Sequence, residues 1–216
     1  QIVLFLRDIR IFAPMTTNRL IRGMIWLSRI GCCRGFGIQS PWAYSLVRYV
    51  INEHYPYYAY ERLAKDFPEA DAVRRKMGEF FLRLANHAQP EMVVAVGFDD
   101  EDMKRDKAYF RAGCNSLRWT GIGPCDADPA LETLGNAPGT HILHANAPAI
   151  DAEWLTEAVK RLRTGDFVVV DRLNYNKAVW QDVVGRLQNI VSFDMYYCGL
   201  VYVDPKRYKQ NYKINF

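Results

Sequence analysis

The sequence predicts an α/β protein whose sheet is mostly parallel and finishes in an antiparallel hairpin. From Met92 onward, short apolar runs alternate with stretches whose apolar residues recur at helical spacing. Before Pro90 the patterns favour helices instead. The last two predicted strands are separated only by Tyr197 to Gly199, which is too short for a parallel crossover.

The first part of the chain predicts a succession of helices. Thr17 or Asn18 could cap the first one, and Ser40 with Pro41 suits the N-cap and first position of the second. The expected helices are 18–30, one that starts at residue 41, 61–65 and 70–87. We therefore expect a helical N-terminal arm over residues 1–68 and an α/β domain over residues 69–216.

The second part predicts alternating strands and helices, and therefore parallel pairing with right-handed crossovers. Six strands are expected, at 92–96, 117–122, 141–144, 167–170, 190–196 and 200–203. The expected helices between them are 100–112, 129–134, 151–162 and 177–187.

Positive charge is concentrated in the arm. Seven arginines and one acid lie between Gln1 and Asn52, a net of +6, while the rest of the chain carries 21 basic and 23 acidic residues, a net of −2. Such an arm could contact a membrane surface, nucleic acid or an acidic partner. We favour a packing role, with its arginines in solvent and its apolar stripe on the main domain. The stripe consists of Leu20, Ile21, Met24, Ile25 and Leu27.

Nucleic acid ranks last among these partners, because the sequence pI of about 8.8 is only mildly basic. The five cysteines form no C-x-x-C pair and suit reduced thiols. No apolar run approaches the roughly 20 residues of a spanning helix, and no secretory signal is recognisable. The expected location is the cytoplasm.

Five segments follow one another in a recognisable order: F-G-I-Q-S-P-W (36–42), Y-Y-A-Y-E (57–61), F-L-R-L-A-N-H-A-Q-P (81–90), V-V-V-D (168–171) and F-D-M-Y-Y-C-G-L-V-Y-V (193–203). Together they resemble class I SAM-dependent methyltransferases, specifically a small group with a helical segment that reads H-G-I-H-S-P-F. The resemblance covers most of the chain. It implies a Rossmann-like sheet that binds SAM.

The resemblance also places the cofactor. In the family the first strand ends in an acid-x-Gly-x-x-x-Gly loop, and an acid that ends the second strand takes the ribose hydroxyls. The matching cofactor positions here are Gly97, Phe98, Asp99, Gly121 and Gly123. Three departures fall on this site: Ala95 replaces the first acid, Glu101 the second glycine, and Ile122 the ribose-binding acid. SAM binding is therefore expected to be weakened or lost.

The catalytic candidates are Asp171, His144 and Asn146, because the carboxyl ends of strands line the site in open α/β sheets. The family's D-G-N-H becomes H-A-N-A at 144–147 and keeps only Asn146, while Asp171 matches the first acid of D-D-I-H-W. Structural alternatives stay open, with Asp171 capping the next turn and His144 hydrogen-bonded in the core. Cys198 is expected in the hairpin turn, without a catalytic role.

About thirty residues, one strand-helix unit, are missing before His141 relative to the family. We therefore expect six strands in the family order 2-1-4-5-7-6, without edge strand 3. An uncovered edge would favour pairing with another chain, so a homo-oligomer is an open alternative. The acids Asp99 to Asp102 suit a helix N-terminus better than a metal site, so we expect no metal.

Two functions of different class remain. The favoured one is a degenerate methyltransferase-like protein, a pseudoenzyme that keeps the scaffold for binding or assembly. The alternative is an active SAM-dependent methyltransferase with an atypical site and an unknown acceptor. The losses at Ala95, Glu101 and Ile122 favour the first, because they are independent and concern one ligand.

Overall fold

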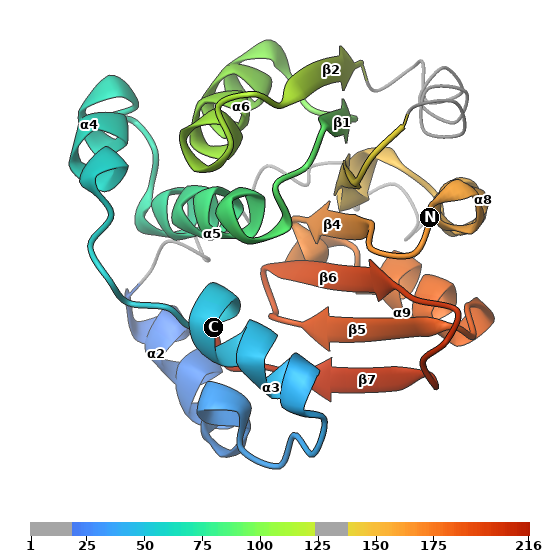
Figure 1. The fold of residues 1–216 in the computed structure, drawn as a ribbon. Helices are drawn as coiled ribbons and strands as arrows, with labels where there is room; N and C mark the ends of the chain where they lie inside the picture. Colours follow the sequence, from blue (N-terminus) through green and yellow to red (C-terminus); the bar gives the residue numbers. More distant parts are fainter. Residues whose placement is uncertain (1–18, 124–137) are drawn as a thin grey trace, which may run out of the picture.

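The computed structural model of the chain describes residues 19–123 and 138–216 (Figure 1). The helical first part comprises α2 (Arg19–Ser28), η2 (Ile30–Gly35), α3 (Pro41–Leu46), η3 (Val47–Ile51), α4 (Tyr58–Asp66) and α5 (Ala72–Ala88). The second part comprises β1 (Met92–Val96), α6 (Asp100–Gly113), β2 (Arg118–Ile122), β3 (His141–Asn146), η4 (Ala147–Ala149), α8 (Ala152–Arg161), β4 (Phe167–Asp171), η5 (Leu173–Tyr175), α9 (Lys177–Arg186), β5 (Ile190–Asp194), β6 (Cys198–Val203) and β7 (Gln210–Lys213). The predicted helix at 129–134 lies outside the described residues.

The strands form one seven-stranded sheet in the order β2-β1-β3-β4-β6-β5-β7. Parallel pairs join β2, β1, β3 and β4, and β6 runs antiparallel to both β4 and β5. The first six strands lie in the order expected from the sequence. The expected count of six is wrong, because β7 adds a strand parallel to β5. The segment Q-N-Y-K that forms β7 lacks the apolar residues that mark a strand.

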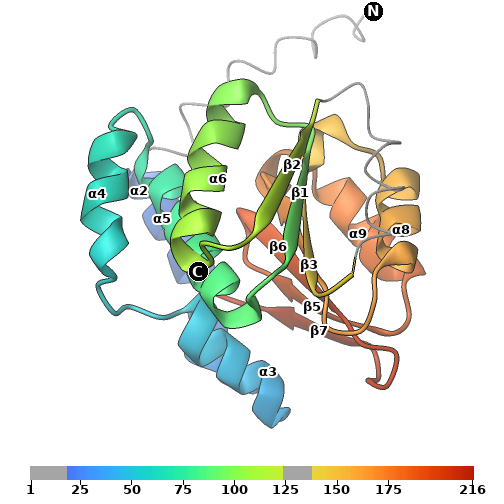
Figure 2. The ribbon, with the colours of Figure 1, turned by 45° about the horizontal axis from the view of Figure 1, so that its top comes forward.

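Helices cover the sheet on both faces (Figure 2). Alternate residues of each strand point to opposite sides. Val93, Ile142 and Val169 join the core beneath α5 and α6, whereas Val94, Leu143 and Val168 join the core beneath α8 and α9. His144 and Asp171 fall in register with the first set. Their side chains therefore point toward α5 and α6.

The helical first part packs on the same core as the sheet. Ala43, Leu46 and Leu63 belong to the cluster that contains Phe80 and Val93. Ser40 caps α3, as predicted, by accepting a hydrogen bond from the amide of Ala43. The boundary at residue 68 stays a prediction. In residues 19–123 and 138–216, no helix is long and apolar enough to cross a membrane.

The prediction that the arm's apolar stripe packs on the main domain is correct for only part of the stripe. No residue of α2 is buried, and Ile21 and Ile25 are half-buried. Met24 and Leu27 are 69% and 61% exposed. The stripe is wider than the contact that the described residues offer, and among them one side of the helix is exposed.

The helix pair α5 and α6 predicts a sharp stability difference between two helical glycines. A Cβ at Gly78 would lie 2.6 Å from the Tyr109 ring, whereas a Cβ at Gly185 meets nothing within 4 Å. Gly78→Ala should lower the free energy of unfolding by about 1–3 kcal/mol through overpacking. Gly185→Ala should raise it by up to about 1 kcal/mol. Urea unfolding of both variants checks this, and equal effects would contradict the described packing.

Candidate functional site

The loop after β1 begins at Gly97, which has a positive φ of 82° that favours glycine. Phe98 follows and is almost wholly buried at 1% exposure. Its ring centroid lies 4.3 Å from that of His144. Phe98 therefore fills space between β1 and β3, beneath the loop where the resemblance placed the cofactor.

The open face of Gly97 is occupied by the protein itself. A Cβ built on Gly97 would lie 2.7 Å from the Cβ of Ala149 and 3.4 Å from that of Asn146. The Asn146 amide also donates a 2.6 Å hydrogen bond to the Gly97 carbonyl. A glycine in this loop of the family leaves room for a ligand, but here η4 is packed against it. A side chain at position 97 would therefore clash with η4 and with the end of β3.

The other positions predicted to bind the cofactor either have a structural role or make no close contact. Asp99 is the N-cap of α6 and accepts a 2.8 Å hydrogen bond from the Asp102 amide. The open side of Gly121 faces the Met103 sulfur, whereas Gly123 has no atom within 4 Å of a built Cβ. Glu101 is exposed. The acids after Gly97 therefore serve to start a helix, which is the role preferred for them from the sequence.

Asp171, at the end of β4, is held by an arginine from α5. Its carboxylate has no exposed surface and pairs with Arg74 through contacts of 2.6 and 3.3 Å. It also accepts a 2.7 Å hydrogen bond from the Arg172 amide, which is the turn-capping alternative considered above. Burial disfavours the charged carboxylate, but the Arg74 guanidinium outweighs it and keeps the pKa of Asp171 below its ordinary value.

A second buried carboxylate, Asp106 on α6, lies near Asp171. Its Oδ1 lies 3.0 Å from the Arg105 guanidinium, and its Oδ2 has no hydrogen-bond partner. Burial is the main reason that the pKa of Asp106 rises to about 7. Asp102 completes the group by pairing with Arg105 and with Arg172. Three guanidinium groups thus face three carboxyl groups.

His144 lies between the two carboxylates. Its Nε2 is 4.0 Å from Asp106 Oδ2 and 4.0 Å from Asp171 Oδ2, too far for hydrogen bonds. The rings of Phe81 and Phe98 pack against it. Burial lowers the pKa of His144 to about 4, so the ring is neutral near pH 7. We call Asp102, Arg105, Asp106, His144, Asp171, Arg172 and Arg74 the buried charge cluster.

Asp106, His144 and Asp171 could each offer one ligand atom to a metal, within 4.8 Å of one another. Arg74 and Arg105 already pair with the two carboxylates. A divalent ion would lie beside these guanidinium groups, which repel it. The donor set therefore suits internal pairing better than a metal.

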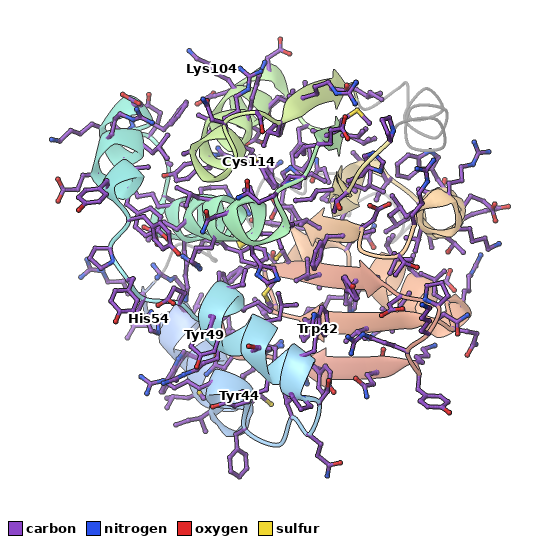
Figure 3. The ribbon with its side chains drawn as sticks, in the orientation of Figure 1. Trp42, Tyr44, Tyr49, His54, Lys104 and Cys114 are labelled. Carbon is purple, nitrogen blue, oxygen red and sulfur yellow. The ribbon has the colours of Figure 1, made fainter. Side chains whose placement is uncertain are left out.

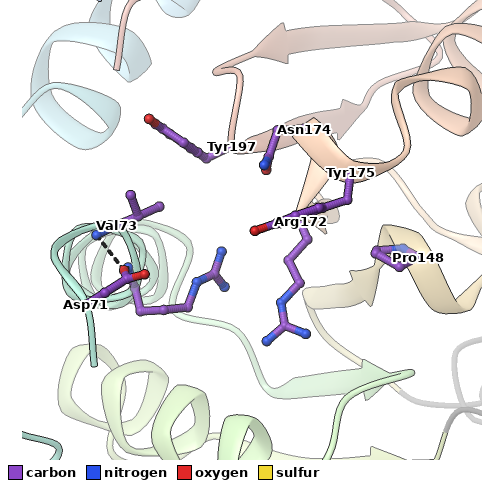
Figure 4. A pocket seen from close by; sticks show the side chains of 8 residues that line it. Asp71, Val73, Pro148, Arg172, Asn174, Tyr175 and Tyr197 are labelled. Carbon is purple, nitrogen blue, oxygen red and sulfur yellow. Dashed lines mark hydrogen bonds between the residues drawn. The ribbon is translucent and has the colours of Figure 1, made fainter. Parts of the chain in front are cut away.

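A pocket of about 370 Å³ opens beside the cluster, between the start of α5 and the segment after β4. Figure 4 shows Arg172, Asn174 and Tyr175 on one side of it and Asp71 with Val73 on the other. Tyr197 and Pro148 line it as well. Its volume is in the range of small-ligand sites. None of the predicted cofactor or catalytic residues is among those that line it.

The sequence placed His144, Asn146 and Asp171 at the carboxyl ends of two adjacent strands, and the structure places them there, all buried. It did not identify Arg74 or Asp106 as their neighbours. Arg74 precedes Met77 by three and Phe81 by seven residues, so its position on the apolar side of α5 was a usable signal. Asp106 carries no such signal.

The predicted position of Cys198 in the hairpin turn is wrong. This cysteine is the first residue of β6 rather than part of the hairpin turn, and it pairs in register with Asp171. Its proximity to the site was therefore not foreseen. Burial raises the pKa of its thiol well above the ordinary value, so the thiolate form is disfavoured.

A mostly parallel sheet with one inserted antiparallel strand defines a Rossmann-like fold of the methyltransferase type. No protein-family model matches the sequence, and no curated protein matches it. Among solved structures, the chain is similar to the O-methyltransferase TomG from Streptomyces achromogenes, which is involved in tomaymycin synthesis and was solved in complex with SAM. That match has 19% identity, covers 69% of this chain and 91% of that chain, and has a TM-score of 0.39.

It is also similar to the SAH-bound methyltransferase PaMTH1 of Podospora anserina, with 10% identity, coverage of 78% of this chain and 98% of that chain, and a TM-score of 0.42. Both scores and both identities are low. The two likenesses therefore leave the cofactor and the activity of this chain undecided.

Proposed function

We propose that this protein keeps a methyltransferase-type scaffold for binding or assembly and does not carry out SAM-dependent methyl transfer. The supporting observation is the closure over Gly97, where Ala149 and Asn146 pack against the loop in which the resemblance places the cofactor. The carboxylate proposed from the resemblance as catalytic, Asp171, is fully buried and paired with Arg74. A group that is already neutralised and closed to solvent is poorly placed to take part in group transfer.

Calorimetric titration of SAM and of its demethylated product SAH tests this proposal. We expect no binding heat up to about 1 mM ligand, because a site closed by side chains must open before it binds and its apparent affinity falls accordingly. A methyltransferase of known SAM affinity, titrated in the same buffer, serves as the control. Micromolar binding of either ligand would contradict the proposal.

The second candidate is an active methyltransferase with an atypical site. The pocket of about 370 Å³ at the carboxyl end of β4 favours it, since ligands bind at that edge of open α/β sheets. Under this candidate Asp171→Ala abolishes turnover of any acceptor found. The matched variant Asp182→Ala, on the exposed side of α9, leaves turnover unchanged.

The edge strand β2 offers a surface for a protein partner. Within the described residues, β2 is an edge strand and its burial pattern is mostly exposed or intermediate. An unpaired edge of this kind can add a strand from another chain. Self-association through β2 is therefore part of the proposed assembly role, and analytical ultracentrifugation measures it.

A further inference from the structure

Helix α2 presents large apolar side chains to solvent. Met24, Leu27 and the following Ile30 are 69%, 61% and 55% exposed. We call these three residues the α2 apolar edge. Met24 and Leu27 are three positions apart, so they lie within about 60° of each other around the helix.

The helix that carries this edge is fixed to the body of the protein. Arg29 is buried and forms a 3.0 Å ion pair with Asp194 at the end of β5. The Asn215 side chain donates a 3.0 Å hydrogen bond to the Trp26 carbonyl. The exposed apolar side chains are therefore held outward by a positioned helix.

A cationic cleft lies between α2 and α5, on the side of α2 that faces the body of the protein. The cleft has a volume of about 500 Å³. Arg19, Arg22 and Lys76 line it without any acidic residue, and Trp26 and Phe216 supply aromatic walls. Lys76 Nζ lies 4.4 Å from the centre of the Phe216 ring. Such a cleft attracts a negatively charged group.

The chain segment that carries α2 has the same sign. Between Arg19 and Asn52 the sequence has five arginines and no aspartate or glutamate. Arg29 is used in the ion pair described above, while Arg34 and Arg48 are exposed. Figure 3 shows Tyr44 and Tyr49 in the lower part of the view, where α3 and η3 lie, and Lys104 at the top. The face thus combines exposed aromatic and aliphatic side chains with Arg19, Arg22 and Lys76, and Glu79 is an acidic neighbour of Lys76.

We propose that α2 docks on an anionic phospholipid bilayer, with the α2 apolar edge entering the interface and the cationic cleft receiving a headgroup phosphate. Amphipathic helices with cations beside their apolar side bind such surfaces through buried apolar area and charge attraction. A second copy of the chain fits this face less well. It would bring two surfaces of the same positive sign together, which opposes association.

Flotation of the full chain with vesicles tests the proposal. We expect binding to phosphatidylcholine vesicles that contain about 30% phosphatidylglycerol, and at least about tenfold weaker binding to phosphatidylcholine alone. Binding should weaken as salt is raised from about 0.05 to 0.5 M, because salt screens the charge attraction. Equal retention by both vesicle types, or no retention at all, would overturn the proposal.

Two pairs of variants locate the contact. Met24→Glu/Leu27→Glu should weaken binding at least about tenfold, and Tyr208→Glu, which alters an exposed ring elsewhere, should not. Lys76→Gln should weaken binding about fivefold, whereas the matched Lys104→Gln on α6 should leave it unchanged. Circular dichroism confirms that each variant is folded. Unchanged binding of the double glutamate variant would refute the role of α2.

If something other than a bilayer covers α2, the flotation and sedimentation experiments give different results. If a second copy covers α2, the wild type sediments as a dimer, the double glutamate variant as a monomer, and neither binds vesicles. If residues 1–18 cover it, the full chain fails to float while a chain that starts at Arg19 binds. Either result would overturn the proposal for the full chain.

Discussion

Arg74→Met is expected to lower the free energy of unfolding by about 3–5 kcal/mol. The reason is that Asp171, with no exposed surface, would be left as an unpaired buried carboxylate. The exposed neighbour Arg75, whose guanidinium donates a hydrogen bond to the Pro68 carbonyl, is the matched control. Arg75→Met should stay within about 0.5 kcal/mol of the wild type in urea unfolding.

The double variant Arg74→Met/Asp171→Asn separates pairing from simple loss of packing. Because it removes both charges together, its loss of stability should be smaller than the sum of the two single losses by at least about 1.5 kcal/mol. Additive losses would show that the two side chains do not depend on each other. That result would return Asp171 to consideration as a group free to act on a substrate.

Opposite pH dependences are expected when His144 and Asp106 are changed separately. Asp106 titrates near 3.8 when unfolded and near 7 when folded, so the folded state keeps a proton that the unfolded state has lost. Its contribution to stability falls as pH rises from about 4 to 7. His144 titrates near 6.5 unfolded and near 4 folded, so its contribution rises with pH between about 4 and 6.5.

The two slopes cancel in the wild type over pH 4 to 6.5, each being about 1.4 kcal/mol per pH unit. Relative to the wild type, His144→Gln should lose stability with that slope as pH rises, and Asp106→Asn should gain it. Urea unfolding at half-unit pH steps gives both difference curves. Two curves with slopes of the same sign would show that the two groups are not buried in the protonation states described.

The sheet was largely predictable from the sequence, because each buried strand is a short apolar run. Met92–Val96 was predicted to the residue, and the antiparallel hairpin followed from its short connection. Strand β7 was missed because Gln210–Lys213 is polar and only half-buried. Its place depends on pairing with β5, which is a tertiary contact that no local pattern encodes.

The site was predictable in position but not in composition. The carboxyl ends of β3 and β4 were identifiable from strand order, and with them His144, Asn146 and Asp171. Their partners Arg74 and Asp106 come from helices, and which helical side chain reaches a strand end depends on how the layers pack. The contact of Ala149 with Gly97 is equally tertiary. The sequence predicted departures from the family's cofactor motif but not which residues pack against Gly97.

The outward side of α2 was also unpredictable, because an amphipathic pattern shows which residues share a face and not whether a partner covers it. Met24 and Ile25 belong to the same predicted stripe, yet Met24 is exposed and Ile25 is half-buried. Arg29, just after the end of this helix, forms an ion pair with Asp194. That ion pair joins residues far apart in the sequence.

The closure over Gly97 is tested most directly by a crystal structure of the protein grown with about 5 mM SAH, well above the micromolar affinity that a working site would show. We predict that Ala149 remains against Gly97, that the Asn146 amide keeps its hydrogen bond to the Gly97 carbonyl, and that no nucleoside density lies beside them. Nucleoside density at the carboxyl ends of β1 and β2, with η4 moved away from Gly97, would contradict the account.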